Sequence, residues 1–258
     1  IEQLNDGSQE DKISGKIAEK QKFYAGLLEK YSKLPADTSK GWFTNKNWVI
    51  STPVETGIAP REKAIKLLDK VRIENCGPYG PWLSAVEGRY MMTIATGVQA
   101  EAEAKYGRTD EALWYVDKIA ETFGMALPGS ISEMMPGYGC PAQAWTIYGL
   151  AFPLVTHIFG IEPDAFNKSV VIEPHLPSGW DRMSISKLPA GNKNISLSVV
   201  KSEKNIEYEL IAENGEWSFI FPLTEFGKNE IYVNGKQVMD HTNGIVVKGK
   251  SNKLRVVL

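Results

Sequence analysis

Cysteine and histidine are scarce in this chain, which has two cysteines and three histidines among its 258 residues. The histidines fall in no spacing typical of metal ligands, and the sequence contains no H-E-x-x-H, P-loop or G-x-G-x-x-G motif. Gly-x-Ser-x-Gly is absent as well. We therefore expect no metal and no cofactor. For Cys76 and Cys140 we expect two small buried thiols, with a disulfide between them as the alternative.

The chain also lacks a charge excess of either sign, because its formal net charge is -2 and its acidic and basic residues are mixed. This pattern excludes a basic stripe for nucleic acid and an acidic disordered tail. No signal-peptide pattern is visible, and the first residue is Ile1 rather than Met, which favours a processed or excised piece. The uncharged run at 142–159 approaches the length of a membrane span, but it contains Pro153 and polar residues. We predict no membrane role.

Two kinds of periodicity divide the chain. Helical spacing predicts helices over 9–34, 61–71, 90–106, 109–123 and 142–159, joined by long loops at 36–60 and 73–88. From near Gly160 the period changes to two, and short apolar runs alternate with turn residues. The pair Asn234-Gly235 is a strong hairpin signal. The predicted fold class is α+β and multidomain, with a helical domain over 1–164 and an antiparallel β-sandwich over 165–258.

The stretch from Ser130 to Phe159 is the most unusual part of the sequence. A loop rich in glycine and proline carries one acid, Glu133, and leads into a segment without charged residues from Pro141 to Thr156. Apolar side chains fall on every face of the predicted helix, so we expect it to be the most buried helix of the fold. Aromatic and amide groups beside an isolated carboxylate are typical of a pocket that processes carbohydrate.

The segment ISEMMPGYGCPAQAW (131–145) resembles bacterial amylo-α-1,6-glucosidases of the glycogen-debranching type, in which a Glu is followed by a Gly-Cys-Pro-Ala-Gln-Ala-Trp run. The segments NWVISTPVETGIA (47–59) and YGRTDEAL (106–113) are similar to six-hairpin glycosidases more widely. IEPHLPSGW (172–180) is similar to the tails of toroid α-glycosidases and α-L-rhamnosidases. This resemblance implies the C-terminal part of an (α/α)6 toroid, followed by a β-sandwich.

The resemblance also implies a chemistry, because these toroids carry their active site in a pit at the N-terminal ends of the inner helices. Loops 73–89 and 125–141 would line that pit. The family uses inverting hydrolysis with two carboxyls, and Glu133 matches the general base, held ionised near the positive end of a helix. The general acid lies in the first half of the toroid, which this chain lacks. An N-terminal half, from the same gene or a second chain, is therefore the expected partner, together with an oligosaccharide or polysaccharide substrate.

Residues that could contact sugar are the aromatic and polar side chains of the predicted loops and the start of the apolar helix. They are Trp48, Glu55, Tyr79, Trp82, Glu87, Arg89, Tyr138 and Gln143. An aromatic ring offers an apolar face for a sugar ring, although core packing explains any one of them as well. A surface ion pair is the alternative for Glu87, and a structural acid before a helix is the alternative for Glu55.

Several functions remain open at this point. An α-glucoside cleaved at its non-reducing end is the first expectation for the substrate, an α-rhamnoside is the second, and a toroid phosphorylase is the third. A phosphorylase uses phosphate in place of a base, so a requirement for Glu133 would argue against it. The rival from another class is a non-catalytic carbohydrate-binding or structural module.

Overall fold

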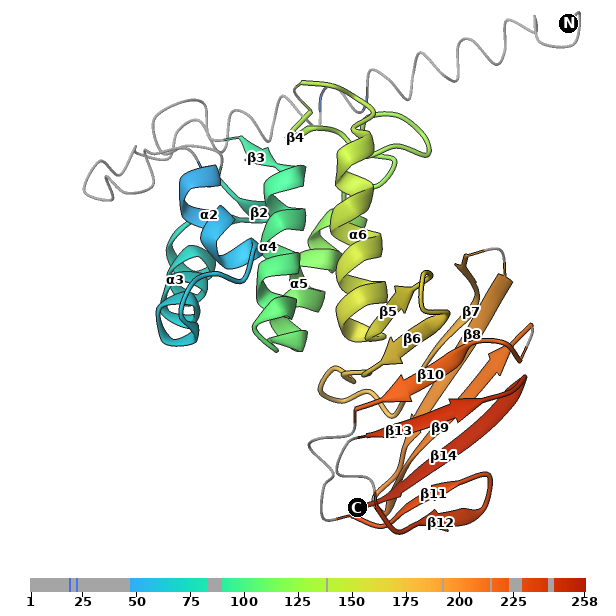
Figure 1. Cartoon of the computed structure of the whole chain (residues 1–258). Helices are drawn as coiled ribbons and strands as arrows, with labels where there is room; N and C mark the ends of the chain where they lie inside the picture. The colour runs from blue at the N-terminus through green and yellow to red at the C-terminus, as the bar shows by residue number, and fades with distance from the viewer. Residues whose placement is uncertain are drawn as a thin grey trace, which may run out of the picture. The chain divides into compact units, whose positions relative to one another are not determined.

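The computed structural model describes residues 47–82, 90–137, 139–191, 193–213, 215–222, 229–240 and 244–258, together with Glu19 and Lys22, and only the main chain of 47–50. Within these residues the chain contains both helices and β-sheets, as the predicted α+β class requires (Figure 1). It forms two compact units, one ending at Ala151 and the other beginning at Phe152. The predicted helix over 9–34 lies outside the described residues apart from two positions, and the predicted domain boundary at 164/165 stays a prediction.

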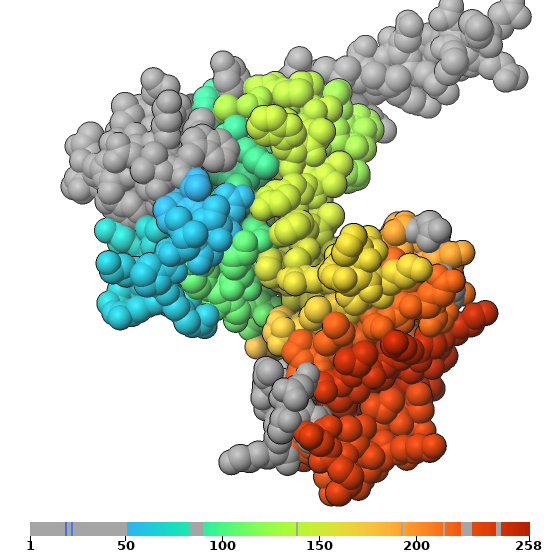
Figure 2. All heavy atoms as spheres, viewed as in Figure 1, coloured from blue at the N-terminus to red at the C-terminus, as the bar shows by residue number. Residues whose placement is uncertain are grey.

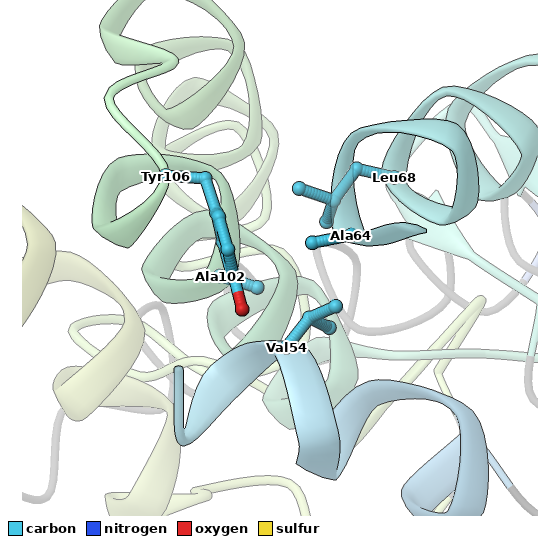
Figure 3. Close-up of a cluster of buried hydrophobic side chains, with 5 residues drawn as sticks. All are labelled: Val54, Ala64, Leu68, Ala102 and Tyr106. Carbon is cyan, nitrogen blue, oxygen red and sulfur yellow. The ribbon is translucent and has the colours of Figure 1, made fainter. Parts of the chain in front are cut away.

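The described part of the first unit contains four helices before the Glu133 loop. They are α2 (Asn47–Glu55), α3 (Arg61–Glu74), α4 (Thr93–Lys105) and α5 (Thr109–Ala120). Helix α2 lies within the segment 36–60 that we predicted as loop, so this part of the prediction is wrong. Its β-branched residues and Pro53 gave a poor helix signal. Tertiary packing overrides that signal, since Val54 is buried against α3 and α4 (Figure 3).

Helix α4 is the most buried helix of the described chain, with every residue from Thr93 to Glu103 buried. One side of α4 belongs to a hydrophobic cluster formed by side chains of α2, α3 and the C-terminal end of α4 (Figure 3). Its members are Val54, Ala64, Leu68, Ala102 and Tyr106. The sequence did not single out α4 because it carries two acids, Glu101 and Glu103, whose side chains are nevertheless buried.

The apolar segment 142–159 is helical but changes geometry twice. It passes from a 3-10 turn, η3 (Ala144–Ile147), through α6 (Tyr148–Phe152) to a π-helical turn, η4 (Pro153–Ile158). Pro153 lacks the N–H that would continue the α-helical hydrogen bonds, which accounts for the widened last turn. The expectation that this segment is the most buried is wrong: Trp145 is 69% exposed and Ile147 60%. Part of this segment accordingly lies at the surface in Figure 2.

The start of this segment packs against α4 through two glycines. A Cβ atom on Gly97 would lie 2.7 Å from the Cα of Gly149, so the two backbones touch. One turn earlier, the hydroxyls of Thr93 and Thr146 are 2.8 Å apart. Successive turns of α4 therefore contact successive turns of the segment that leads into α6. Because both contacts advance along the chain together, α4 and α6 run in the same direction.

A partly buried ion-pair network holds the turn between α4 and α5. Arg108 Nε lies 2.6 Å from Glu103 Oε2, and Arg108 Nη2 lies 2.7 Å from Asp69 Oδ1 on α3. Arg108 also lies 3.7 Å from Glu111. Burial raises the pKa of Glu103 from 4.5 to about 7, against the lowering effect of the Arg108 charge. Helix α5 begins at Thr109 without a side-chain cap.

The raised pKa of Glu103 predicts a pH-dependent stability. Between pH 4.5 and about 7, Glu103 keeps a proton in the folded chain that it releases in the unfolded chain. Its contribution to the unfolding free energy is therefore fully present below pH 4.5 and is lost as the pH rises to about 7. The loss is on the order of 3 kcal/mol. We expect Glu103→Gln to reduce the difference in unfolding free energy between pH 5 and pH 8, measured by urea titration. The exposed control Glu62→Gln should leave that difference unchanged, and an unchanged difference in Glu103→Gln would refute the assignment.

The second unit consists of two packed sheets. The four-stranded sheet has the order β13-β10-β6-β5 and the six-stranded sheet the order β12-β11-β14-β9-β8-β7. The strands are β5 (Ile161–Asp164), β6 (Ser169–Ile172), β7 (Arg182–Ala190), β8 (Lys193–Lys201), β9 (Asn205–Ala212), β10 (Ser218–Phe221), β11 (Ile231–Val233), β12 (Lys236–Val238), β13 (Ile245–Lys248) and β14 (Ser251–Val257). The rings of Tyr208 and Phe221, from different sheets, meet edge to face at 5.8 Å.

The β unit departs from the prediction in two respects. Strand β10 pairs with β6 in parallel, so the smaller sheet is mixed rather than purely antiparallel. Strands β5 and β7 were not predicted, and in β7 the register shifts between Ile185 and Leu188, which breaks the alternation that marks a strand. The Asn234-Gly235 hairpin is confirmed, with both residues at positive φ between β11 and β12. Within the described ranges, no helix has the length and apolar character needed to cross a membrane.

Candidate active site

Three short antiparallel segments lie against α4 and position Glu133. They are β2 (Gly80–Pro81), β3 (Met91–Met92) and β4 (Met134–Met135); β2 also pairs with β1 (Cys76–Gly77). Met91 lies opposite Met135 on one side and opposite Trp82 on the other. These pairings therefore place Glu133, next to β4, on one side of β3 and Trp82 on the other.

The main chain of Glu133 lies where hydrogen bonds between residues 131–133 and 140–143 close a loop; these residues are called the loop neck below. Its N–H donates to the carbonyl of Cys140 at 2.8 Å, and the N–H of Gln143 donates to the carbonyl of Ile131 at 2.7 Å. The carbonyl of Glu133 accepts a hydrogen bond from the N–H of Thr93, at 2.9 Å. Because Thr93 is the first residue of α4, the loop is tied directly to the start of the most buried helix.

Two buried threonines, Thr93 and Thr146, stabilise the loop neck through hydrogen bonds. Neither was among the predicted site residues. The hydroxyl of Thr93 lies 2.6 Å from the carbonyl of Ser132, to which it donates. The hydroxyl of Thr146 lies 2.8 Å from that of Thr93 and can donate to it. Satisfied polar groups of this kind hold a loop in one arrangement. Each Thr is unremarkable in the sequence, and only the packing of the loop on α4 brings them together.

The carboxylate of Glu133 is held within its own loop. The N–H of Cys140 donates to Glu133 Oε2 at 2.9 Å. Gly139 has a φ of +79°, and a Cβ atom there would lie 2.5 Å from the same oxygen. A larger residue at this position would therefore displace the carboxylate and would also be strained by the positive φ. A fixed, partly exposed carboxylate can accept a proton from water, which is the role of a general base.

The contact with Glu133 predicts the effect of a substitution at Gly139. We expect Gly139→Ala to displace the carboxylate and to destabilise the helical unit by about 2 kcal/mol, part of it from the positive φ. Gly129→Ala is a matched control, because Gly129 has a similar φ of +76° but an added Cβ meets nothing within 4 Å. Urea unfolding should show the larger loss at Gly139. That excess should become smaller when both glycine variants are made in a Glu133→Ala background, which removes the carboxylate and keeps only the Cβ of residue 133, at 3.2 Å. An excess of unchanged size there would contradict the contact with the carboxylate.

The aromatic candidates of the second loop lie beside the same strands. The Trp82 ring covers Gly77, where a Cβ would lie 2.6 Å from the ring and from the Met91 sulfur. Tyr79 is held through its main chain, since its carbonyl accepts a hydrogen bond of 2.9 Å from the Thr96 hydroxyl on α4. Both side chains are half-buried. The structure thus brings Tyr79 and Trp82 to the same end of α4 as Glu133.

Glu55 lies apart from this group. Its carbonyl accepts a hydrogen bond of 2.8 Å from Lys105, at the opposite end of α4, and its carboxylate accepts one of 3.2 Å from the Tyr148 hydroxyl. Burial, together with Glu101 and Glu55, raises the pKa of Tyr148, which therefore stays a hydrogen-bond donor.

The other predicted site residues are placed in part or not at all. Gln143 lies in the loop neck and precedes η3, although its side chain forms no cap there. Trp48 lies in α2, whose side chains at that end are not described. Glu87, Arg89 and Tyr138 lie outside the described residues. Their roles stay predictions.

Both cysteines are free thiols, so the alternative of a disulfide is wrong. Cys76 is partly buried, 3.4 Å from the Tyr115 hydroxyl, and burial raises its pKa to about 12. A thiol with so high a pKa is a poor nucleophile. Cys140 is exposed, which corrects the expectation that it is buried, and it serves the site through its main chain.

Similarity to known proteins is visible in structure and not in sequence. No protein-family model matches the chain, and no curated protein matches it either. The chain has a fold similar to part of a glycosidase. That structure is the α-L-rhamnosidase from Dictyoglumus thermophilum, with a TM-score of 0.54, 14% identity and 86% of this chain covered. The chain spans 26% of the length of that rhamnosidase.

A putative kojibiose phosphorylase from the human microbiome is also similar, with a TM-score of 0.38 and 9% identity over 78% of this chain and 24% of its own. This likeness is too weak to carry an argument. The comparison with the rhamnosidase thus agrees with a glycosidase-type fold. The comparisons do not support the specific assignment to the amylo-α-1,6-glucosidases.

Proposed function

We propose that this chain is the base-bearing part of a glycoside hydrolase that cleaves α-glycosidic bonds at the non-reducing end with inversion. The observation that carries the proposal is the fixed Glu133 carboxylate, held by the Cys140 N–H in a loop tied to the start of α4. The likeness in fold to an α-L-rhamnosidase supports the same class of reaction. No cofactor is needed for this chemistry.

In the proposed reaction, Glu133 removes a proton from a water molecule whose oxygen attacks the anomeric carbon. The bond from that carbon to the leaving oxygen breaks, and a general acid protonates the leaving oxygen, so charge and protons balance. Inverting enzymes hold the two carboxyls about 6.5–9.5 Å apart to leave room for the water. We assign the general acid to a helical segment outside these 258 residues, as the family resemblance implies.

The proposed partner is the rest of an (α/α)6 toroid, in the same protein or in a second chain. Exposed apolar side chains of the helical unit, among them Trp145 and Ile147, support a neighbour that covers them. The chain also spans only 26% of the rhamnosidase to which it is similar. In such a toroid, Tyr79 and Trp82 would contact the sugar beside Glu133.

Two substrate classes are proposed for the full protein. The α-L-rhamnosides come first because the structure with the similar fold is an α-L-rhamnosidase, although that likeness shows the fold alone. The α-glucosides come second, on the resemblance of 131–145 to glycogen-debranching enzymes. Assays of the full-length protein with aryl α-L-rhamnosides and aryl α-D-glucosides, with the anomer of the released sugar followed by NMR, test both. We expect an inverted product from one of them. Turnover that requires phosphate would instead indicate a phosphorylase, and no turnover of either would favour the non-catalytic module.

A further inference from the structure

The outer face of the six-stranded sheet contains a groove far in sequence from Glu133. Its volume is about 290 Å³, and side chains of β8, β9, β11 and β14 line it with the hairpin glycine Gly235. These strands all belong to the second unit (Figure 1). The proposed hydrolysis makes no use of this face.

The strand register arranges the groove side chains in rows. Val200 lies opposite Glu207, Glu207 opposite Arg255, and Arg255 opposite Tyr232. Residues that are directly opposite point to the same face of a sheet, so these four form one continuous row across four strands. The row presents an apolar group, an acid, a base and an aromatic ring in that order.

A second row runs beside the first. Ser198 lies opposite Glu209, and Glu209 lies opposite Lys253. The Lys253 ammonium forms an ion pair with Glu209 at 3.2 Å. The two rows together carry two acids and two bases, so the groove has no net charge from these four side chains. It offers hydrogen-bond donors and acceptors in alternation.

The aromatic end of the groove is already fixed in orientation. The guanidinium carbon of Arg255 lies 4.6 Å from the centre of the Tyr232 ring, within the range of a cation–π contact. The Tyr232 hydroxyl donates to Glu230 Oε2 at 2.9 Å. Side chains held before a ligand arrives lose less conformational freedom on binding.

We propose that this groove binds a neutral oligosaccharide segment, as a second sugar site away from Glu133. Adjacent sugar hydroxyls both donate and accept hydrogen bonds, which matches alternating carboxylates and cations. An anionic ligand would meet Glu207 and Glu209, and a cationic one would meet Lys253 and Arg255. The inference rests on the proposed function only for the choice of sugars to test.

Affinity electrophoresis of the whole chain in native gels containing glycogen or a neutral rhamnan tests this site. We expect one of the two polysaccharides to retard the wild type. Which of them does so shows whether the ligand is a glucan or a rhamnose-bearing polymer. The Tyr232→Ala/Arg255→Ala variant should bind at least ten-fold more weakly than the wild type. The matched control is Phe166→Ala/Lys248→Ala, which removes an exposed aromatic and an exposed cation outside the groove.

Two results would overturn the proposal. One is the absence of retardation of the wild type in both polysaccharides. The other is equal retardation of the groove variant and the control, with thermal unfolding showing that both are folded. Hydrolysis is not needed for the readout, so failure of the proposed enzymatic function would leave the binding result intact.

Discussion

Glu133→Gln in the full-length protein is expected to lower kcat for glycoside hydrolysis by roughly 10²–10⁴-fold, the usual range for loss of a general base. Glutamine keeps the size of the side chain and can still accept a hydrogen bond from the Cys140 N–H. It cannot take a proton from water at neutral pH. The variant should therefore bind substrate normally, with KM nearly unchanged, while turnover falls.

The control for this prediction is Glu55→Gln, which changes a partly buried acid that is also hydrogen-bonded but lies toward the other end of α4. We expect a much smaller fall in kcat there. Steady-state kinetics on the better of the two aryl glycosides measure both variants. If Glu133→Gln keeps more than about a tenth of wild-type kcat, the carboxylate is not the base and its contacts serve only the loop.

The largest expected effect on stability is that of Gly149→Ala. In an isolated helix this change would favour folding by roughly 0.5–1 kcal/mol. Here the added Cβ would meet the main chain of Gly97, which no rotamer change can relieve. Helices α4 and α6 would have to separate, losing the packing around Ile119 as well. We expect a net loss of about 2–3 kcal/mol in unfolding free energy, followed by far-UV circular dichroism in urea.

A matched control separates packing from helix propensity. Ala151→Gly lies in the same helix at an exposed position, and it should cost only about 0.5–1 kcal/mol from propensity alone. Gly97→Ala should repeat the effect of Gly149→Ala, because each glycine meets the backbone of the other. Neutral or stabilising effects of both alanine variants would show that the two helices do not touch as described.

Periodicity predicted the parts of the fold whose signals are local. The amphipathic helices α3 and α5 and the Asn234-Gly235 hairpin follow from spacing and turn chemistry. Helix α2 was missed because Pro53 and β-branched residues oppose a helix, while the burial of Val54 favours it. The burial of 142–159 was overestimated, since an apolar surface shows only that a helix needs neighbours and does not supply them.

The candidate site was predictable in its chemistry and only partly in its geometry. An isolated Glu133 in a glycine- and proline-rich loop was visible in the sequence. The pairing of Thr93 with Ser132 and Thr146 spans more than one element, and nothing local marks it. The same holds for Gly139, because loop glycines are common and only the approach of the Glu133 carboxylate gives this one a specific role.

The most direct test of the central claim is chemical rescue of Glu133→Ala by azide in the full-length protein. Removing the carboxylate leaves space beside the anomeric carbon, where azide can attack without a base. If Glu133 is the general base of an inverting hydrolase, azide should restore turnover and give a glycosyl azide with inverted configuration. If azide leaves the rate unchanged and forms no such product, Glu133 is not the base and the proposed mechanism is wrong.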